Sequence, residues 1–250
     1  MGASADLDTV RRWLRPSVAR PGGVAVLTGA GMSAESGIPT FRDAMSGLWA
    51  RFDPAELASE EGFRADPERV WSWYEERRAG VRAALPNAGH LALAGFDRRH
   101  PGAMVLVTQN VDDLHQRAGV AHTIRLHGDI LEDRWLQPSR HGGCTADAAE
   151  LPPRCARCGN LRRPGVVWFG EMLPEDALHA AAQAAQGCDV MLVVGTSGAV
   201  WPAAGLAGQA RRSGARVVIV NPHASEIDDE AHVVLRGTAA VMLPALMDGI

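Results

Sequence analysis

A glycine-rich turn is the first stretch whose residue types suggest chemistry. The turn reads Gly-Ala-Gly at residues 29–31 and directly follows an apolar run at 24–27. In α/β folds such a turn holds phosphate, because glycine lets backbone N–H groups come close and a helix start adds positive dipole. The third glycine of the dinucleotide fingerprint is absent, so these three residues alone could be a plain turn. Pro39 then interrupts helix propagation, and positions 41–43 hold an aromatic residue, a cation and an acid that suit a flexible cover over a nucleotide.

Three further loops follow apolar runs that end at residues 108, 194 and 220. The loops contain Gln109, Asn110 and Asp112, then Gly195, Thr196 and Ser197, then Asn221 and Pro222. Ligands bind at the carboxyl ends of strands in open α/β sheets. Each loop alone could be a plain connection, and Asn110 and Asp112 could serve only to cap a helix. Taken together the loops predict a nucleotide site, in which Asn221 suits a ribose contact.

His127 is the candidate catalytic base among nine histidines. It ends a short apolar run at 124–126 and precedes Gly128, which permits close backbone approach. A neutral imidazole with an unperturbed pKa of about 6.5 can take a proton near neutral pH. The alternative is a structural histidine.

Six separated motifs, in order, resemble the sirtuins, the NAD-dependent protein deacylases. They are the stretch 29–42, Thr-Gln-Asn-Val-Asp-Asp-Leu-His at 108–115, Leu-His-Gly at 126–128, Val-Val-Trp-Phe-Gly-Glu at 166–171, Gly-Thr-Ser at 195–197 and Asn-Pro at 221–222. The resemblance spans roughly residues 20 to 245. It implies NAD as cofactor and acylated protein lysines as substrates. The NAD contacts that it implies are Gly29, Ala30, Gly31, Ser33, Glu35, Ile38, Pro39, Phe41, Arg42, Gln109, Asn110, Asp112, Gly195, Thr196, Ser197, Asn221, Pro222 and Ala239.

The resemblance also implies the reaction and its catalytic residues, His127 and Asn110. The acyl-lysine carbonyl oxygen displaces nicotinamide from C1′ of the ribose. His127 then helps to deprotonate a ribose hydroxyl, which attacks the resulting imidate. Asn110, Asp112 and Ile38 would form the nicotinamide pocket. The products would be free lysine, nicotinamide and 2′-O-acyl-ADP-ribose.

The extended apolar segment 166–171 could take a substrate peptide as an added strand. Its alternative is a core strand with a turn at Gly170. The resemblance assigns Val167, Trp168 and Phe169 to peptide binding.

Tyr74 and Arg77 lie three residues apart in a helical stretch and so share one face. From the residues alone this is a solvated charged face with aromatic anchors. The class III sirtuins, active on succinyl, malonyl and glutaryl lysine, are similar here. They have Tyr-x-x-Arg and a small residue sixteen positions before the tyrosine, which in this chain is Ala58. The resemblance implies that Arg77 pairs with the acyl carboxylate and that Tyr74 donates a hydrogen bond to it.

Three cysteines lie close together in a polar segment, which in a cytosolic chain argues for metal rather than disulfides. Cys188, by contrast, precedes an apolar run and is expected in the core. Sirtuins carry two Cys-x-x-Cys pairs that bind zinc. Here one pair remains, and a shifted His-x-x-Cys replaces the other. We expect one structural zinc, and the alternative is a module that has lost zinc and is held by packing. The expected ligands are Cys144, Cys155, Cys158 and His141.

The elements that must position these residues alternate between strands and helices. Strands are expected at 24–27, 104–108, 124–126, 190–194, 217–220 and 233–235, and helices at 7–14, 88–99, 111–118, 174–186 and 202–213. Continuous apolar runs predict a doubly wound parallel α/β sheet, a Rossmann-like domain. Residues 43–86, with a long helix from 67 to about 84, and residues 129–165 interrupt the alternation. We expect a nucleotide-binding domain of 1–42, 87–128 and 166–250, and a smaller domain made of a helical module (43–86) and a zinc-type module (129–165).

The composition limits which classes of protein function the chain can have. The chain has 250 residues and a net charge of -4, so no nucleic-acid footprint is expected. It has no apolar stretch that could cross a bilayer and no signal peptide is read, so we expect a cytoplasmic monomer. All 25 basic residues are arginine, which suggests a bacterium with GC-rich codons and excludes regulation by acylation of the protein's own lysines. The competing functions are a mono-ADP-ribosyltransferase and a non-catalytic NAD sensor.

Overall fold

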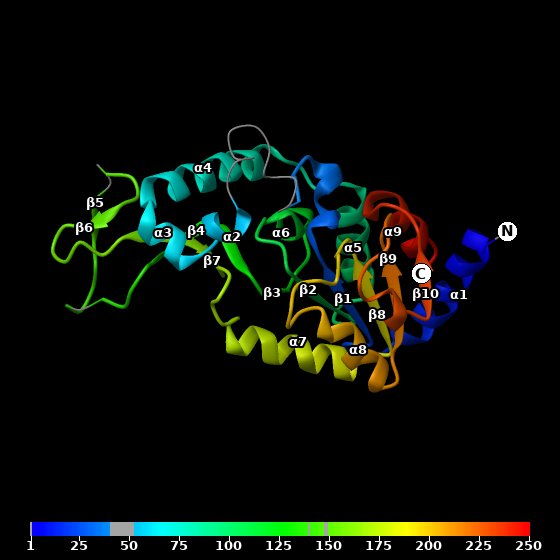
Figure 1. Ribbon diagram of the computed structural model, residues 1–250. Helices are drawn as coiled ribbons and strands as arrows, with labels where there is room; N and C mark the ends of the chain where they lie inside the picture. Colours follow the sequence, from blue (N-terminus) through cyan, green and yellow to red (C-terminus); the bar gives the residue numbers. More distant parts are fainter. Residues whose placement is uncertain (1, 41–52, 140, 148–149) are drawn as a thin grey trace.

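The computed structural model describes residues 2–40, 53–139, 141–147 and 150–250. A six-stranded sheet lies at its centre in the order β10-β9-β8-β1-β2-β3, with every pair parallel (Figure 1). The strands are β1 (Val24–Thr28), β2 (Met104–Thr108), β3 (Thr123–Arg125), β8 (Val190–Val194), β9 (Arg216–Val220) and β10 (Val233–Leu235). The predicted doubly wound sheet is confirmed.

The three central strands end level with one another. Thr28 at the end of β1 pairs with Thr108 of β2 on one side and with Val194 of β8 on the other. The chain proceeds from β1 to one side of the sheet and returns to the other side, so β1 lies where the strand order reverses. Ligands bind at this place in open α/β sheets, and the loops that begin at residues 29, 109 and 195 meet there.

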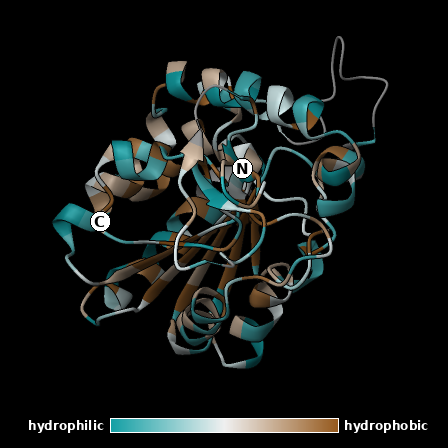
Figure 2. Cartoon of the chain, turned by 90° about the vertical axis from the view of Figure 1, so that its left-hand side faces the viewer, coloured by the Kyte–Doolittle hydropathy of each residue, from teal (hydrophilic) through white to brown (hydrophobic). Residues whose placement is uncertain are grey.

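Alternate residues of each strand face two different apolar layers. Val24 and Val26 pack with helices α1 (Gly2–Ser17), α5 (Ala88–Arg99) and α9 (Ala239–Met247). Ala25 and Leu27 pack with α7 (Glu175–Gly187) and α8 (Gly205–Arg212) on the opposite face. Figure 2 shows the resulting apolar strands enclosed by helices whose outer surfaces are hydrophilic. Because both faces are covered, the strands read as continuous apolar runs.

A third apolar cluster forms a smaller lobe beside the sheet (Figure 1). Helices α2 (Pro54–Leu57), α3 (Glu60–Ala65) and α4 (Pro67–Ala83) cover the antiparallel pair β4 (Gly128–Trp135) and β7 (Arg162–Val166). A second short pair joins β5 (Ala146–Asp147) to β6 (Arg154–Cys155). The buried cluster contains Leu57, Phe63, Trp73, Tyr74, Ile130, Val166 and Trp168. The predicted division into domains stays a prediction, and this core also includes Val166 and Trp168 from the segment assigned to the nucleotide-binding domain.

Local capping explains where the two long central helices begin. The Asp66 side chain accepts a hydrogen bond from the Arg69 backbone N–H at 3.1 Å, and Pro67 supplies the preset first turn of α4. Asn87 and His90 form a capping box at the start of α5. These signals lie in the sequence itself, and both helices begin where they were expected.

Some elements differ from the prediction. Helix α6 spans Leu114–Ala118 rather than starting at 111, because the carbonyl groups of Val111 and Asp112 accept hydrogen bonds from Arg125 instead of continuing a helix. Helix α8 starts at Gly205 rather than 202, and α1 is longer than expected. The small antiparallel sheets and α9 were not expected. None of the helices in the ranges given above is long and apolar enough to span a membrane.

Candidate active site

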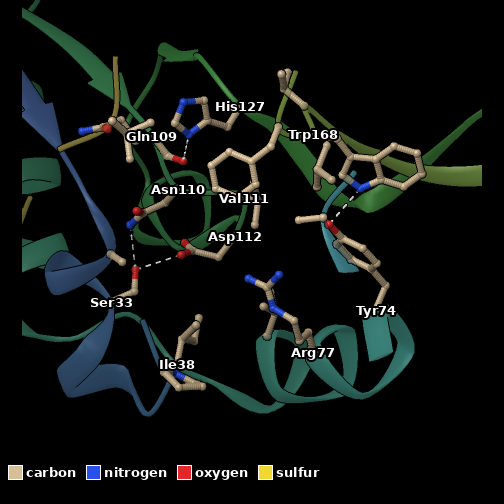
Figure 3. A pocket seen from close by; sticks show the side chains of 18 of the residues that line it. Ser33, Ile38, Tyr74, Arg77, Gln109, Asn110, Val111, Asp112, His127 and Trp168 are labelled. Atoms are coloured by element: carbon tan, nitrogen blue, oxygen red, sulfur yellow. Dashed lines mark hydrogen bonds between the residues drawn. The ribbon is translucent and has the colours of Figure 1, made fainter. Parts of the chain in front are cut away.

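A cavity of about 470 Å³ lies between the carboxyl edge of the large sheet and the smaller lobe (Figure 3). Its lining includes the predicted site residues Ala30, Ser33, Ile38, Pro39, Ala58, Tyr74, Arg77, Gln109, Asn110, Asp112, His127, Val167, Trp168 and Phe169. Other predicted residues lie outside this lining, namely Gly29, Gly31, Glu35, Gly195, Thr196, Ser197, Asn221, Pro222 and Ala239. Phe41 and Arg42 fall outside the described residues.

The glycines of the first loop hold two loops in close contact. The backbone N–H of Gly29 donates to Val194 O at 2.9 Å, and that of Gly31 donates to Gly195 O at 2.8 Å. A Cβ atom at Gly31 would lie 2.8 Å from the Gly195 Cα. The sequence predicts that this turn holds phosphate through backbone N–H groups, but those of Gly29 and Gly31 each donate within the protein. Ala30 is the residue of this turn that lines the cavity.

Thr196 ties the three nucleotide loops together. Its hydroxyl accepts a hydrogen bond from Gln109 Nε2 at 3.1 Å, and its carbonyl accepts one from Asn221 Nδ2 at 2.8 Å. The predicted loops therefore meet at the carboxyl edge of the sheet, as the strand order requires.

Glu35 and the start of α9 form a separate contact. A Glu35 carboxylate oxygen accepts the backbone N–H of Ala240 at 2.9 Å, while Ala239 is buried. A carboxylate at a helix N-terminus is a favourable electrostatic arrangement. Glu35 and Ala239, both predicted to contact NAD, therefore lie near each other. In this structure the Glu35 carboxylate accepts a hydrogen bond at the N-terminus of α9.

His127 presents one ring nitrogen to the backbone. Its Nδ1 lies 2.8 Å from the carbonyl oxygen of Gln109, which can only accept, so Nδ1 carries the proton and Nε2 keeps its lone pair. Burial lowers the pKa of His127, and the Gln109 contact opposes this. Gly128 beside it has a φ of 79°, and a Cβ atom there would lie 2.2 Å from Gly165 O. The close backbone approach expected at Gly128 is confirmed.

Ser33, Asn110 and Asp112 form a hydrogen-bonded chain in the cavity wall (Figure 3). The Asn110 amide donates to Ser33 Oγ at 3.2 Å, and Ser33 Oγ donates to Asp112 Oδ2 at 2.9 Å. The other oxygen of Asp112 accepts the backbone N–H of Leu114 at 3.1 Å. Burial raises the pKa of Asp112, and these hydrogen bonds oppose the rise. Asp112 therefore binds the first residue of α6 as well as forming the cavity wall, whereas Asn110 does not cap this helix.

Arg125 supports this wall and was not predicted. Its guanidinium donates to the carbonyl oxygens of Val111 and Asp112 at 3.0 and 2.7 Å and pairs with Asp129 at 2.9 Å. Its position in the otherwise apolar segment 124–126 could have identified Arg125 from the sequence.

Tyr74 and Arg77 line the far end of the cavity with Ala58 and Trp168. Tyr74 is 2% exposed, and the Trp168 indole donates to its hydroxyl at 2.9 Å. The Arg77 guanidinium lies 4.7 Å from the centre of the Trp73 ring. Burial raises the pKa of Tyr74 and lowers that of Arg77. Tyr74 is therefore buried rather than solvated, while Arg77 is half-buried and lines the cavity.

Other cavity residues on α4 follow the same helical spacing. Trp73 and Val81 lie four residues before and after Arg77 and line the same cavity. Arg78 faces the small sheet instead, is 3% exposed, and donates to Glu132 O at 3.1 Å. The four-residue period in the sequence could have identified Trp73 and Val81.

Residues 167–169, which follow β7 and were predicted to bind peptide, are held by hydrogen bonds within the protein. The N–H groups of Val167 and Phe169 donate to His127 O and Ala58 O at 2.9 and 2.8 Å, and that of Trp168 donates to Glu171 Oε2 at 2.8 Å. A peptide added as a strand therefore cannot use these three donors, which restricts the pairing expected for this segment.

The metal candidates converge in the smaller lobe, away from the cavity lining. The ligand atoms of His141, Cys144, Cys155 and Cys158 all lie within 4.8 Å of one another. The Cys144 Sγ to Cys158 Sγ distance is 3.7 Å, and His141 Nε2 lies 3.5 Å from Cys155 Sγ. A tetrahedron with Zn–S near 2.3 Å and Zn–N near 2.0 Å has edges of about 3.5 to 3.8 Å. The four residues fit a structural zinc. The fourth cysteine, Cys188, is buried, which raises the pKa of its thiol to about 11.

Several known proteins are similar to this chain. Residues 29–202 match the model of the Sir2 family. An NAD-dependent protein deacylase of Ralstonia nicotianae is 55% identical over 226 residues, covering 90% of each chain. One from Mycobacterium tuberculosis is 46% identical over 233 residues, covering 90% of this chain and 96% of the relative.

Solved structures agree with this similarity. A complex of a Sir2 homologue with NAD matches with a TM-score of 0.82 at 43% identity, covering 94% of this chain and 91% of the other. A Sir2 protein bound to a propionylated peptide matches with a TM-score of 0.79 at 30% identity, covering 94% and 96%.

Proposed function

This chain belongs to the Sir2 family, the sirtuins, and is an NAD-dependent protein deacylase; on that premise we propose that it prefers acidic acyl groups on lysine. Succinyl and malonyl lysine would be the main substrates, with glutaryl as a longer member of the series and acetyl as a poorer substrate. The observation that carries the proposal is the Tyr74–Arg77 pair at the far end of the cavity.

Arg77 contributes a cation to the cavity lining, which also contains the carboxyl groups of Glu76, Asp112 and Glu171. Ala58, Trp73 and Val81 line the same region. Burial lowers the pKa of Arg77, which means that its charged form loses hydration. Arginine nevertheless stays protonated in proteins. A ligand carboxylate would compensate for that lost hydration, whereas the methyl group of an acetyl chain would not.

Tyr74 adds a neutral donor beside the cation. Burial raises its pKa, so the phenol keeps its proton at physiological pH. Its ring centre lies 5.7 Å from the Arg77 guanidinium carbon. A cation and a hydroxyl donor side by side suit the two oxygens of one carboxylate.

The remaining cavity residues suit the transfer chemistry. NAD supplies the ADP-ribose that accepts the acyl group. We infer that Asn110 and Asp112 hold the carboxamide of the leaving nicotinamide. His127 Nε2 would take the proton of a ribose hydroxyl, since Nδ1 is committed to Gln109. The zinc residues lie away from this cavity lining and would stabilise the smaller lobe.

The test compares kcat/KM for acetyl, succinyl and malonyl forms of one peptide. A charged hydrogen-bonded contact contributes about 1.5–3 kcal/mol, or roughly a ten- to hundredfold effect. Arg77→Met keeps much of the side-chain packing and should reduce succinyl turnover by that factor with little change for acetyl. Arg82→Met removes an exposed charge from the same helix and serves as the matched control. Equal losses on both peptides with Arg77→Met would make Arg77 structural.

Nicotinamide release in the same assay separates the competing reactions. A deacylase needs the acylated peptide to release nicotinamide. Release with an unacylated protein acceptor would instead indicate ADP-ribosyl transfer, and binding of NAD without release would indicate a sensor.

A further inference from the structure

Trp168 and Tyr74 come from segments that are far apart in the chain and meet in the cavity wall. The indole Nε1 lies 2.9 Å from the Tyr74 hydroxyl across a sequence separation of 94 residues, and both residues are 2% exposed (Figure 3). An indole N–H can only donate, so the phenol oxygen is the acceptor.

This bond fixes where the phenol proton can go. Within the described ranges, the Trp168 contact is the one hydrogen bond recorded for the Tyr74 hydroxyl. Because the oxygen already accepts from Trp168, its own proton must point away from the indole. Both residues line the cavity that also contains Arg77, so this proton is available to a ligand there.

The Trp168 ring is itself held from two sides. The Arg163 guanidinium lies 3.2 Å from the ring centre, and Phe63 lies against it with ring centroids 5.2 Å apart. Arg163 is 1% exposed and ion-paired with Glu171, whose second carboxylate oxygen accepts the Trp168 backbone N–H at 2.8 Å. A buried arginine needs such a partner. The direction of the indole N–H is therefore set by packing around it.

We propose that Trp168 is a specificity-determining positioning residue: its indole N–H orients the Tyr74 hydroxyl so that the phenol proton is presented to the carboxylate of an acidic acyl chain. The inference rests on the proposed acidic-acyl preference and names a residue that acts through Tyr74 rather than by touching the carboxylate. Without the indole donor, the hydroxyl can rotate and lose its preferred direction.

The experiment is a double-mutant cycle with Trp168→Phe, Tyr74→Phe and the double variant, each assayed on succinyl and acetyl forms of one peptide. Trp168→Phe keeps an aromatic face for Arg163 and removes the N–H. We expect the ratio of succinyl to acetyl kcat/KM to fall about three- to tenfold, the effect of one neutral hydrogen bond. The loss should appear in KM more than in kcat, because the contact exists before and during the reaction.

The double variant carries the decisive comparison. If Trp168 acts through the hydroxyl, the double variant should lose no more succinyl selectivity than Tyr74→Phe alone. Trp71→Phe makes the same replacement on the Tyr74 helix; Trp71 is 4% exposed and lies outside the cavity lining, so selectivity should not change.

Four results would overturn the inference. Equal losses on both peptides would make Trp168 structural, and a further succinyl-specific loss in the Tyr74→Phe background would mean that Trp168 acts elsewhere. If Trp168→Phe does not fold, a Tyr74→Phe enzyme with wild-type selectivity would show that there is no hydroxyl contact to orient. A wild-type enzyme without acidic-acyl preference would instead refute the proposed function, and this inference with it, so the two failures are distinguishable.

Discussion

The Nδ1 atom of His127 lies 2.8 Å from the carbonyl oxygen of Gln109, and this contact selects the tautomer of the catalytic candidate. With the proton on Nδ1, Nε2 is free to accept another. His127→Ala should therefore lower kcat by about 10²- to 10⁴-fold, the usual contribution of a positioned base. NAD binding, measured by calorimetry, should change little. His179→Ala removes an exposed histidine of α7 and should leave kcat unaltered; a similar fall in both variants would contradict the role of His127.

The activity should decrease on the acid side at a pH below the ordinary pKa of histidine. Burial lowers the pKa of His127 from 6.5, and the base acts in its neutral form. Activity should therefore persist at pH 6.5 and fall only at lower pH, as His127 takes up a proton. The measurement is kcat/KM against pH with an acetyl peptide, because its acyl chain has no carboxylate to titrate. A limb centred above pH 6.5 would be inconsistent with a buried base.

Zinc content tests the four convergent ligands of the smaller lobe. Purified protein should contain about one zinc per chain, and chelation should lower the melting temperature. Cys155→Ser should lose the metal, whereas Cys188→Ala should retain it because Cys188 lies in the core of the large domain. Folded, active wild-type protein without metal would mean that packing alone holds the module.

His90 and His115 should make the fold sensitive to acid. Their rings lie 4.8 Å apart, and burial lowers the pKa of His90 to about 4 and that of His115 to about 3. The neighbouring Arg125 also lowers the pKa of His115. In the unfolded chain both titrate near 6.5, so below that pH the unfolded state binds more protons. The free energy of unfolding should then fall as pH drops from about 6.5 towards 4, by up to about 1.4 kcal/mol per pH unit for each histidine.

The matched variant for this acid effect is His90→Gln. Glutamine can keep the backbone contact of the capping box without titrating. Urea unfolding at a series of pH values should give a shallower dependence for the variant, since the carboxylates are the same in both proteins. Identical slopes would show that His90 does not contribute.

Gly195 should not tolerate a side chain. Its φ is +62°, and an added Cβ would lie 2.5 Å from the Met32 backbone nitrogen. Gly195→Ala should cost at least about 1–2 kcal/mol of folding free energy from the backbone conformation alone and should weaken NAD binding by separating the loops. Gly187→Ala at the end of α7 meets no atom within 4 Å and should be neutral or stabilising. Urea unfolding of the two variants checks the contrast.

The large sheet could be predicted closely because its strands are buried on both faces. Such strands leave continuous apolar runs, as β1 and β8 do. The small antiparallel sheet could not, because β4 and β7 carry charged residues that are normally exposed. Arg163 in β7 is 1% exposed only because Glu171 and Trp168 surround it.

The sequence could predict site residues that lie within one loop or one helix. It could not predict the contacts between segments that are far apart in the chain. The spacing of Tyr74 and Arg77 identified one helical face. The sequence could not show that Trp168 reaches Tyr74 from 94 residues away, nor that Gly31 would donate to Gly195 rather than face a ligand. Both contacts depend on tertiary packing that local patterns do not encode.

Tyr74 is the one tyrosine of the chain, which makes the far end of the cavity observable by itself. Protein grown with a fluorinated tyrosine would give a single fluorine resonance. That nucleus would lie on a buried ring beside Arg77, where a bound carboxylate changes the local field. Fluorescence from the seven tryptophans would come from many parts of the molecule. The single fluorine resonance would instead report only whether the acyl-binding end of the cavity is occupied, and it would need no spectral assignment.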